Sequence, residues 1–182
     1  MQPYQDVWIK GNLHEAGQRD CTARYAAIKS NLSGDGFSVL DMGAYSGYFS
    51  FRLAEDFNAK CLAIDDYIHL PKLVRANANP NVKALNKRLS LGQFQDLGRF
   101  DVILCLSFLH HVDNWRGHLE YILENSACAF IEIPHPSEIL PNARNKDILM
   151  DIYKAVHDIP GEDIAQVSGY DNTQDRVLRK VQ

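Results

Sequence analysis

Short, continuous apolar runs recur along this chain, and each is followed by a stretch in which apolar residues return at helical spacing. Continuous apolar runs are typical of strands that are covered on both faces of a sheet. Strands are predicted at residues 37–42, 61–66, 82–89, 100–107 and 127–133. Helices are predicted over residues 21–32, after Ser46, and over 69–77, 108–125 and 145–158. Regular alternation of strands and helices predicts a parallel sheet with helices on both faces.

The two ends of the chain depart from this alternation. Residues 1–19 mix aromatic, glycine and polar residues, which favours an irregular arm. Residues 164–170 and 176–181 predict two strands joined by a polar turn, which is an antiparallel hairpin. The predicted fold is therefore α/β, a doubly wound and mostly parallel sheet with a C-terminal antiparallel hairpin. We expect residues 1–36 to form an arm and a helix that act as a lid on a single domain of residues 37–182.

Two polar residues are placed to begin helices. Asp20 precedes the first predicted helix, and Ser46 precedes the second, whose apolar stripe consists of Phe49, Leu53 and Phe57. A side-chain oxygen at the N-cap accepts a hydrogen bond from a backbone N–H that has no partner within the helix. We therefore expect Asp20 and Ser46 to be N-caps.

Residues 39–50 join a strand to a helix through a glycine-spaced turn. The spacing is Asp41-x-Gly43-x-x-x-Gly47, and glycine lets the backbone approach a ligand closely. The dinucleotide fingerprint Gly-x-Gly-x-x-Gly is absent, because Tyr45 stands where its second glycine would be. That tyrosine, together with an acid that repels phosphate, favours a ligand without pyrophosphate. S-adenosylmethionine, which carries an ammonium and a sulfonium, fits both requirements; the alternative is an ordinary turn whose glycines serve packing.

A second acidic signal follows after one strand-helix-strand step. Asp65 and Asp66 end the strand predicted at residues 61–66. An acid at this point, about 20 residues beyond the glycine turn, accepts the hydroxyl protons of a ribose. The sequence therefore predicts a nucleoside ligand held by Asp65, with an incidental surface acid as the alternative.

The order of these segments resembles the class I S-adenosylmethionine-dependent methyltransferases over residues 35–182. Residues 39–47 look like the first motif of that family, and residues 63–65 look like its second-strand acid. Residues 100–112 are similar to its fourth strand and exit loop. The resemblance implies a Rossmann-like methyltransferase fold, S-adenosyl-L-methionine as the cofactor, and methyl transfer as the reaction.

The resemblance also implies roles for single residues. The implied cofactor-binding residues are Asp41, Gly43, Ala44, Tyr45, Gly47, Asp65, Asp66, Leu106 and Ser107. The first five would hold the methionine portion of the cofactor. Asp65 would bind the ribose hydroxyls, and Asp66 is the alternative contact to the adenosine. Leu106 and Ser107 would flank the cofactor through backbone groups.

Two positions depart from the pattern of the family. Tyr45 replaces a glycine, and its ring is expected either to pack on the cofactor or to narrow the pocket. The family often places an acid or an amide after the third strand, where it binds the adenine amine, whereas this chain has Arg88-Leu89-Ser90-Leu91. Ser90 or a backbone group is the expected substitute.

Methyl transfer from a sulfonium is an in-line displacement, so the protein must align the reactants and exclude water. A general base is needed only when the nucleophile arrives protonated. His110, His111 and His135 are each predicted near the carboxyl end of a strand, where a neutral imidazole is able to take such a proton. His110 and His135 are the candidate catalytic residues, with a structural histidine at a turn as the alternative for each. Glu132, inside the last parallel strand, is expected to reach the rim of the pocket.

Composition and charge limit the classes of partner. The apolar fraction of 46% and the charged fraction of 23% are ordinary for a soluble globular protein. The net charge of -4 gives no global basic field for nucleic acid, and no Asn-Pro-Pro-Tyr sequence of the nucleic-acid amino methyltransferases follows the fourth strand. We expect a small-molecule acceptor or an accessible group of a larger molecule, and RNA remains an alternative. Tyr4 and Trp8 either wall a small pocket or pin the arm to the core.

The remaining chemistry-bearing residues predict no second site. The four cysteines and the histidines at 110, 111, 118 and 135 have no metal-ligand spacing, so no metal is predicted. Cysteines inside apolar runs favour reduced core thiols in a reducing, cytoplasmic setting. No apolar run approaches the roughly 20 residues of a membrane span, and the N-terminus has no signal-peptide pattern.

Two other functions stay open on the sequence alone. The same fold is able to serve as a catalytically weak or inactive binding or regulatory partner, and Tyr45 and the missing adenine acid favour that alternative. A nicotinamide-dependent reductase is the third possibility, and the glycine spacing argues against it.

Overall fold

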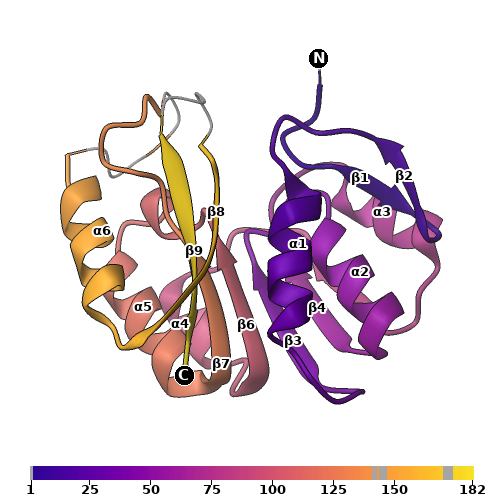
Figure 1. The fold of residues 1–182 in the computed structure, drawn as a ribbon. Helices are drawn as coiled ribbons and strands as arrows, with labels where there is room; N and C mark the ends of the chain where they lie inside the picture. The colour runs from indigo at the N-terminus through magenta and orange to yellow at the C-terminus, as the bar shows by residue number, and fades with distance from the viewer. Residues whose placement is uncertain (1, 141–142, 144–146, 170–173) are drawn as a thin grey trace.

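A seven-stranded sheet forms the centre of the computed structural model, which describes residues 2–140, 143, 147–169 and 174–182. The strands are β3 (Ser38–Met42), β4 (Lys60–Ile64), β5 (Val82–Leu85), β6 (Phe100–Leu106), β7 (Ser126–Glu132), β8 (Gly161–Ser168) and β9 (Asp175–Val181). Their order in space is β5-β4-β3-β6-β7-β9-β8 (Figure 1). The first five are parallel, and β9 and β8 are antiparallel. The predicted fold class is confirmed, including the C-terminal hairpin.

Helices cover both faces of the sheet. They are α1 (Cys21–Ser30), α2 (Tyr48–Phe57), α3 (Leu70–Asn77), α4 (Leu91–Gln95), α5 (Trp115–Asn125) and α6 (Leu149–Asp158), with the short 3₁₀ helix η1 (Leu109–His111). Figure 1 shows α1, α2 and α3 on one face and α4, α5 and α6 on the other. Side chains alternate along each strand. Val39 therefore packs with the first group of helices, and its neighbour Leu40 packs with the second.

The irregular arm predicted for residues 1–19 instead contains an antiparallel hairpin of β1 (Val7–Ile9) and β2 (Asn12–Glu15). Its two-residue turn, Lys10-Gly11, has φ angles of +48° and +78°. Two positive φ angles are typical of a type I′ turn, which matches the twist of paired strands. The hairpin escaped prediction because a lysine, and not the usual Asn or Asp, precedes the glycine.

The hairpin is held against the core. The indole N–H of Trp8 donates to Glu55 Oε2 at 2.8 Å, and its ring lies edge-on to Tyr48 of α2. The Asn77 amide donates to Trp8 O and accepts from Lys10 N, both at 2.9 Å. Trp8 therefore pins the arm to α2 and α3.

One predicted helix cap is confirmed and the other is wrong. Asp20 Oδ1 accepts from Ala23 N at 2.9 Å, as expected at the start of α1. The N-cap of α2 is Gly47, at φ +79°, and no side chain caps this helix. The Ser46 hydroxyl bonds to the arm and not to the helix, because it donates to Asp6 O at 2.8 Å.

Several boundaries differ from the prediction. β5 ends at Leu85, so residues 86–89 leave the sheet. The predicted helix at residues 108–125 is divided into η1 and α5. β8 begins at Gly161, and residues 170–173, at the tip of the predicted hairpin, lie outside the described residues. Among the described helices, none is both long and apolar enough to cross a membrane.

Candidate active site

The carboxyl ends of β3, β4 and β6 meet at a cavity of about 720 Å³. Ligand pockets typically have about 300–1,000 Å³. Gly43 follows β3, Asp65 follows β4 and Ser107 follows β6, and all three line the cavity. β4 and β5, which follow β3 in the chain, lie on one side of β3, and β6 lies on its other side. The carboxyl end of β3 is therefore the switch point at which open α/β sheets bind ligands.

The glycine turn is fixed to the neighbouring strand. The backbone N–H groups of Gly43 and Ala44 both donate to Ile64 O, at 2.9 and 3.1 Å. Gly43 has φ +76°, and a Cβ there would lie 3.0 Å from the Phe108 ring. This position requires glycine both for its backbone conformation and for the close approach of Phe108.

Tyr45 has a left-handed backbone conformation, with φ +49°. It stands at a position where the family often has glycine. Its N–H donates to Asp65 Oδ2 at 2.9 Å, and the N–H of Tyr67 donates to Asp65 Oδ1 at 2.7 Å. The rings of Tyr45 and Tyr67 stack with centroids 4.0 Å apart. The Tyr45 hydroxyl also accepts from Tyr4 N at 3.4 Å. Tyr45 therefore connects the glycine turn, Asp65 and the arm, and it lines the cavity.

Asp65 is held by two backbone donors beside the cavity. Burial raises the pKa of its carboxyl group, and the hydrogen bonds from Tyr45 and Tyr67 oppose that shift. A carboxylate has about four lone-pair sites, so Asp65 keeps acceptor capacity beyond these two bonds. Asp66 also lines the cavity, but its half-exposed carboxylate forms an ion pair with Arg88.

Four of the predicted site residues do not line the cavity: Asp41, Ala44, Gly47 and His135. Asp41 is 2% exposed and accepts a hydrogen bond from the Ser50 hydroxyl at 2.8 Å. Burial raises the pKa of Asp41 to about 7, against the lowering effect of the Ser50 bond. The structure thus brings together Gly43, Tyr45, Asp65, Asp66, Leu106, Ser107 and His110. The individual roles of all these residues stay predictions.

One end of the cavity is mostly apolar. Its walls include Leu89, Leu91, Phe94, Phe108 and His118. The Ser90 hydroxyl, predicted as a possible adenine contact, is engaged in capping α4, where it accepts from Gln93 N. His118 was missed by sequence reasoning, because no motif marks it; its ring lies edge-on to Phe94 and Phe108.

The other end is walled by the arm, η1 and the C-terminal part of the chain. Tyr4 and Gln18 come from the arm, His110 from η1, and Arg176 from β9. His110 is 2% exposed. Burial, followed by the charges of His111 and Arg176, holds the pKa of His110 well below its ordinary value. His110 is therefore a neutral imidazole at neutral pH.

His135 does not line the cavity, although its backbone N–H donates to Glu138 Oε1 at 3.0 Å. Its Nδ1 lies 2.7 Å from the Ser137 hydroxyl, and its ring is edge-on to Tyr153 of α6. The two predicted catalytic histidines are thus not brought together, and only His110 lines the cavity.

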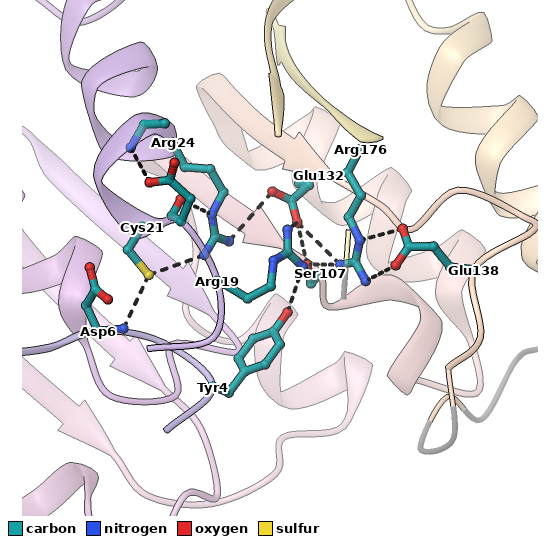
Figure 2. A network of polar contacts seen from close by, with 11 residues as sticks. Tyr4, Asp6, Arg19, Cys21, Arg24, Ser107, Glu132, Glu138 and Arg176 are labelled. Atoms are coloured by element: carbon teal, nitrogen blue, oxygen red, sulfur yellow. Dashed lines mark hydrogen bonds and ion pairs between the residues drawn. The ribbon is translucent and has the colours of Figure 1, made fainter. Parts of the chain in front are cut away.

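A buried network of charges backs the cavity, and sequence reasoning missed it. Figure 2 shows Glu132 among Arg19 and Arg24, which lie around the start of α1, and Arg176 of β9. Glu132 Oε1 lies 2.9 Å from Arg19 and 3.4 Å from Arg176, and Oε2 lies 3.6 Å from Arg24. The Ser107 hydroxyl donates to Glu132 at 2.7 Å. Glu132 is 0% exposed, so it does not reach the pocket rim as expected.

The network fixes the ionisation of Glu132 and the position of Arg176. Burial alone would raise the pKa of Glu132, but the three guanidinium groups and the Ser107 hydroxyl lower it to about 2. Arg176 donates to both carboxylate oxygens of Glu138, each at 2.8 Å, and to the Ser107 hydroxyl at 2.7 Å. No group of three potential metal ligands occurs among the residues that the structure describes.

A protein-family model described as "Methyltransferase domain" matches residues 13–155. No curated protein sequence matches the chain significantly. Among solved structures, the bifunctional kinase-methyltransferase WbdD has a TM-score of 0.71 at 20% identity, over 91% of this chain and 40% of WbdD. This chain thus spans less than half of that protein.

Two further structures match over most of both chains. The N-terminal domain of EvdMO1, in the presence of S-adenosylhomocysteine (SAH) and D-fucose, has a TM-score of 0.67 at 15% identity, over 99% of this chain and 91% of that one. The N-methyltransferase NodS from Bradyrhizobium japonicum WM9, in complex with SAH, has a TM-score of 0.64 at 15% identity, over 87% and 84%. At these identities the likeness shows a shared fold. With the family model matching most of its length, the chain belongs to the class I S-adenosylmethionine-dependent methyltransferase family.

Proposed function

We propose that this protein transfers a methyl group from S-adenosyl-L-methionine to a small molecule or to an accessible group of a larger one. The observation that carries the proposal is the cavity at the switch point, where Gly43 and the fixed carboxylate of Asp65 lie together. A nucleoside with a methionine tail fits these residues. Asp65 has lone pairs left for ribose hydroxyls, and the turn at Gly43 presents no Cβ.

The bound cofactor would supply an electrophilic methyl group. The protein then has to position the cofactor and the acceptor and to exclude water from the site. Tyr45 and Tyr67 hold Asp65 in place, while the arm contributes Tyr4 and Gln18 to the wall of the cavity. His110, which is neutral, is the candidate to take a proton from a hydroxyl or ammonium acceptor.

The named relatives do not supply the acceptor. NodS is called an N-methyltransferase, and the EvdMO1 structure was determined in the presence of D-fucose, but one fold hosts many functions. The acceptor of this protein depends on the residues that line its own cavity.

Parallel calorimetric titrations with SAH, S-adenosylmethionine and NAD test the proposal. We expect the first two to bind with micromolar affinity and NAD not to bind. Binding of NAD alone would favour a reductase. Absence of any binding would favour a regulatory partner that has kept the fold.

Replacing Asp65 by alanine should weaken SAH binding by about 10- to 100-fold, because a hydrogen bond to a charged group contributes about 1.5–3 kcal/mol. Asp66→Ala is the matched control, since Asp66 lines the same cavity but is paired with Arg88. We expect it to change the affinity less than threefold. An SAH analogue without the ribose 2′-hydroxyl should bind wild type more weakly than SAH does, yet bind Asp65→Ala as SAH does. A larger loss in Asp66→Ala would assign the ribose to Asp66.

His110→Gln should lower kcat for a protonated acceptor by about 10²–10⁴-fold, the usual contribution of a general base, while SAH affinity is retained. His135→Gln should stay within threefold of wild type, because His135 does not line the cavity. Thermal unfolding of both variants checks that they are folded. Equal rates for His110→Gln and wild type would leave His110 a structural residue.

A further inference from the structure

Arg176 brings a positive charge to the end of the cavity walled by the arm. The lining residues contributed by the arm, η1 and β9 include Tyr4, Gln18, His110, His111 and Arg176. Of these, Arg176 carries a full positive charge, whereas His110 is neutral. The acidic lining residues come from other segments: Asp65 and Asp66 follow β4, and Asp113 follows η1.

The network behind this wall is not balanced. The guanidinium groups of Arg19, Arg24 and Arg176 are matched within it by the carboxylates of Glu132 and Glu138. The five groups therefore carry one net positive charge, and each of them is more than nine-tenths buried. A further carboxylate, Asp6, lies beyond Cys21, on the side of the network away from Arg176 (Figure 2). Low polarity around buried groups makes such an imbalance felt over a longer distance than at the surface.

Arg176 and Arg19 also act on the neighbouring His110. Burial is the first cause that lowers the pKa of His110, His111, Arg176 and Arg19 lower it further, and Glu132 raises it. Arg176 uses its Nε and one N–H of Nη2 for Glu138, and Nη1 for Ser107 and Glu132. A guanidinium has five N–H groups, so one N–H of Nη2 remains beyond these four contacts.

On the basis of the methyltransferase function proposed above, we infer that this end of the cavity receives an acceptor bearing an anionic group, a carboxylate or a phosphate, directed at the remaining N–H of Arg176. Such a group supplies the negative charge that the five-residue network lacks. It also attracts the cationic methyl donor, whereas an ammonium acceptor would be repelled by both Arg176 and the sulfonium. Because Glu138 and Glu132 hold Arg176 in place, its guanidinium needs no rearrangement to meet the anion.

The experiment uses two anions and a neutral control. Protein saturated with SAH is titrated with inorganic phosphate, with acetate, and with acetamide, which has the shape of acetate without its charge. We expect at least one anion to bind and acetamide not to bind. Phosphate and acetate together identify which anion the site prefers.

A pair of charge variants tests the location, since Arg176 itself is too deeply buried to replace safely. Gln18→Glu places a negative charge in the exposed arm beside the cavity, and Gln95→Glu places the same charge on the exposed end of α4, outside the lining. We expect Gln18→Glu to weaken anion binding about tenfold, equivalent to about 1.4 kcal/mol, and Gln95→Glu to leave it within twofold.

The outcomes separate this inference from the function on which it rests. Failure of SAH to bind would refute the proposed function and the inference with it. SAH binding without binding of either anion would overturn the inference alone. Anion binding that SAH displaces would also overturn it, because the positive end would then serve the carboxylate of the cofactor. Equal losses in Gln18→Glu and Gln95→Glu would show a general charge effect and no acceptor site.

Discussion

Replacing Glu132 by glutamine will lower the free energy of unfolding by about 3–5 kcal/mol, the usual effect of removing one partner from a buried ion pair. The glutamine has nearly the same volume, so the loss comes from charge and not from a cavity. Arg19 and Arg24 would then lack a carboxylate within the network, and Arg176 would keep only Glu138. Chemical denaturation of the variant and of wild type at pH 7 measures the difference.

Asp163→Asn is the matched control, because it makes the same carboxylate-to-amide change in the Asp163–Arg179 ion pair, where Asp163 is about half exposed. We expect a loss below about 1 kcal/mol there. The contribution of Glu132 should also depend on pH. Its folded pKa, about 2, is below its ordinary value of 4.5, so the contribution is present above pH 4.5 and lost as the pH falls toward 2. Equal losses in Glu132→Gln and Asp163→Asn would mean that water reaches the network.

Asp41→Asn should have the opposite kind of effect, a gain in stability at high pH. The folded pKa of Asp41, about 7, lies above its ordinary value of 3.8, so the folded state holds a proton that the unfolded state has lost between these values. Stability from this group is therefore full below pH 3.8 and falls as the pH rises through 7. The shift corresponds to about 4 kcal/mol. The variant has a neutral amide at every pH and avoids this loss.

Denaturation curves of wild type and Asp41→Asn between pH 4 and 8 test this prediction. The stability of the variant relative to wild type should rise with pH. Asp101→Asn serves as a control: hydrogen bonds from the Ser38 backbone and hydroxyl lower the pKa of Asp101 below its ordinary value of 3.8, so its contribution is already complete near pH 4, and the stability difference of its variant should stay nearly constant from pH 4 to 8. A flat difference for Asp41→Asn would show that its carboxyl group ionises normally.

The parts of the fold and site that sequence predicted are those with a local signal. Apolar runs and glycine spacing predicted the sheet and placed Gly43 and Asp65 at one cavity, because strand ends meet wherever parallel strands pair. Residues 1–36 were expected to act as a lid, and Tyr4 and Gln18 of that segment do line the cavity.

The missed parts depend on contacts between distant residues. Arg19 and Arg24 lie around the start of α1, far along the chain from Glu132 and Arg176, and nothing in their own neighbourhoods marks them as buried. Asp41 was assigned to the cofactor by motif alone, whereas its nearest partner, Ser50, is on the following helix. The sequence around Asp41 does not indicate whether its carboxyl group will face the cavity or the helix that follows.

The position of Arg176 also has a consequence for the order of folding. Glu132 lies 44 residues before Arg176, and β9 inserts between β7 and β8. As the chain is synthesised from its N-terminus, β3 to β7 are complete before β9 exists. The wall that Arg176 contributes can close only when β9 joins β7. A growing chain should therefore assemble the edge of the cavity formed by β3, β4 and β6 first, and complete the wall at Arg176 later.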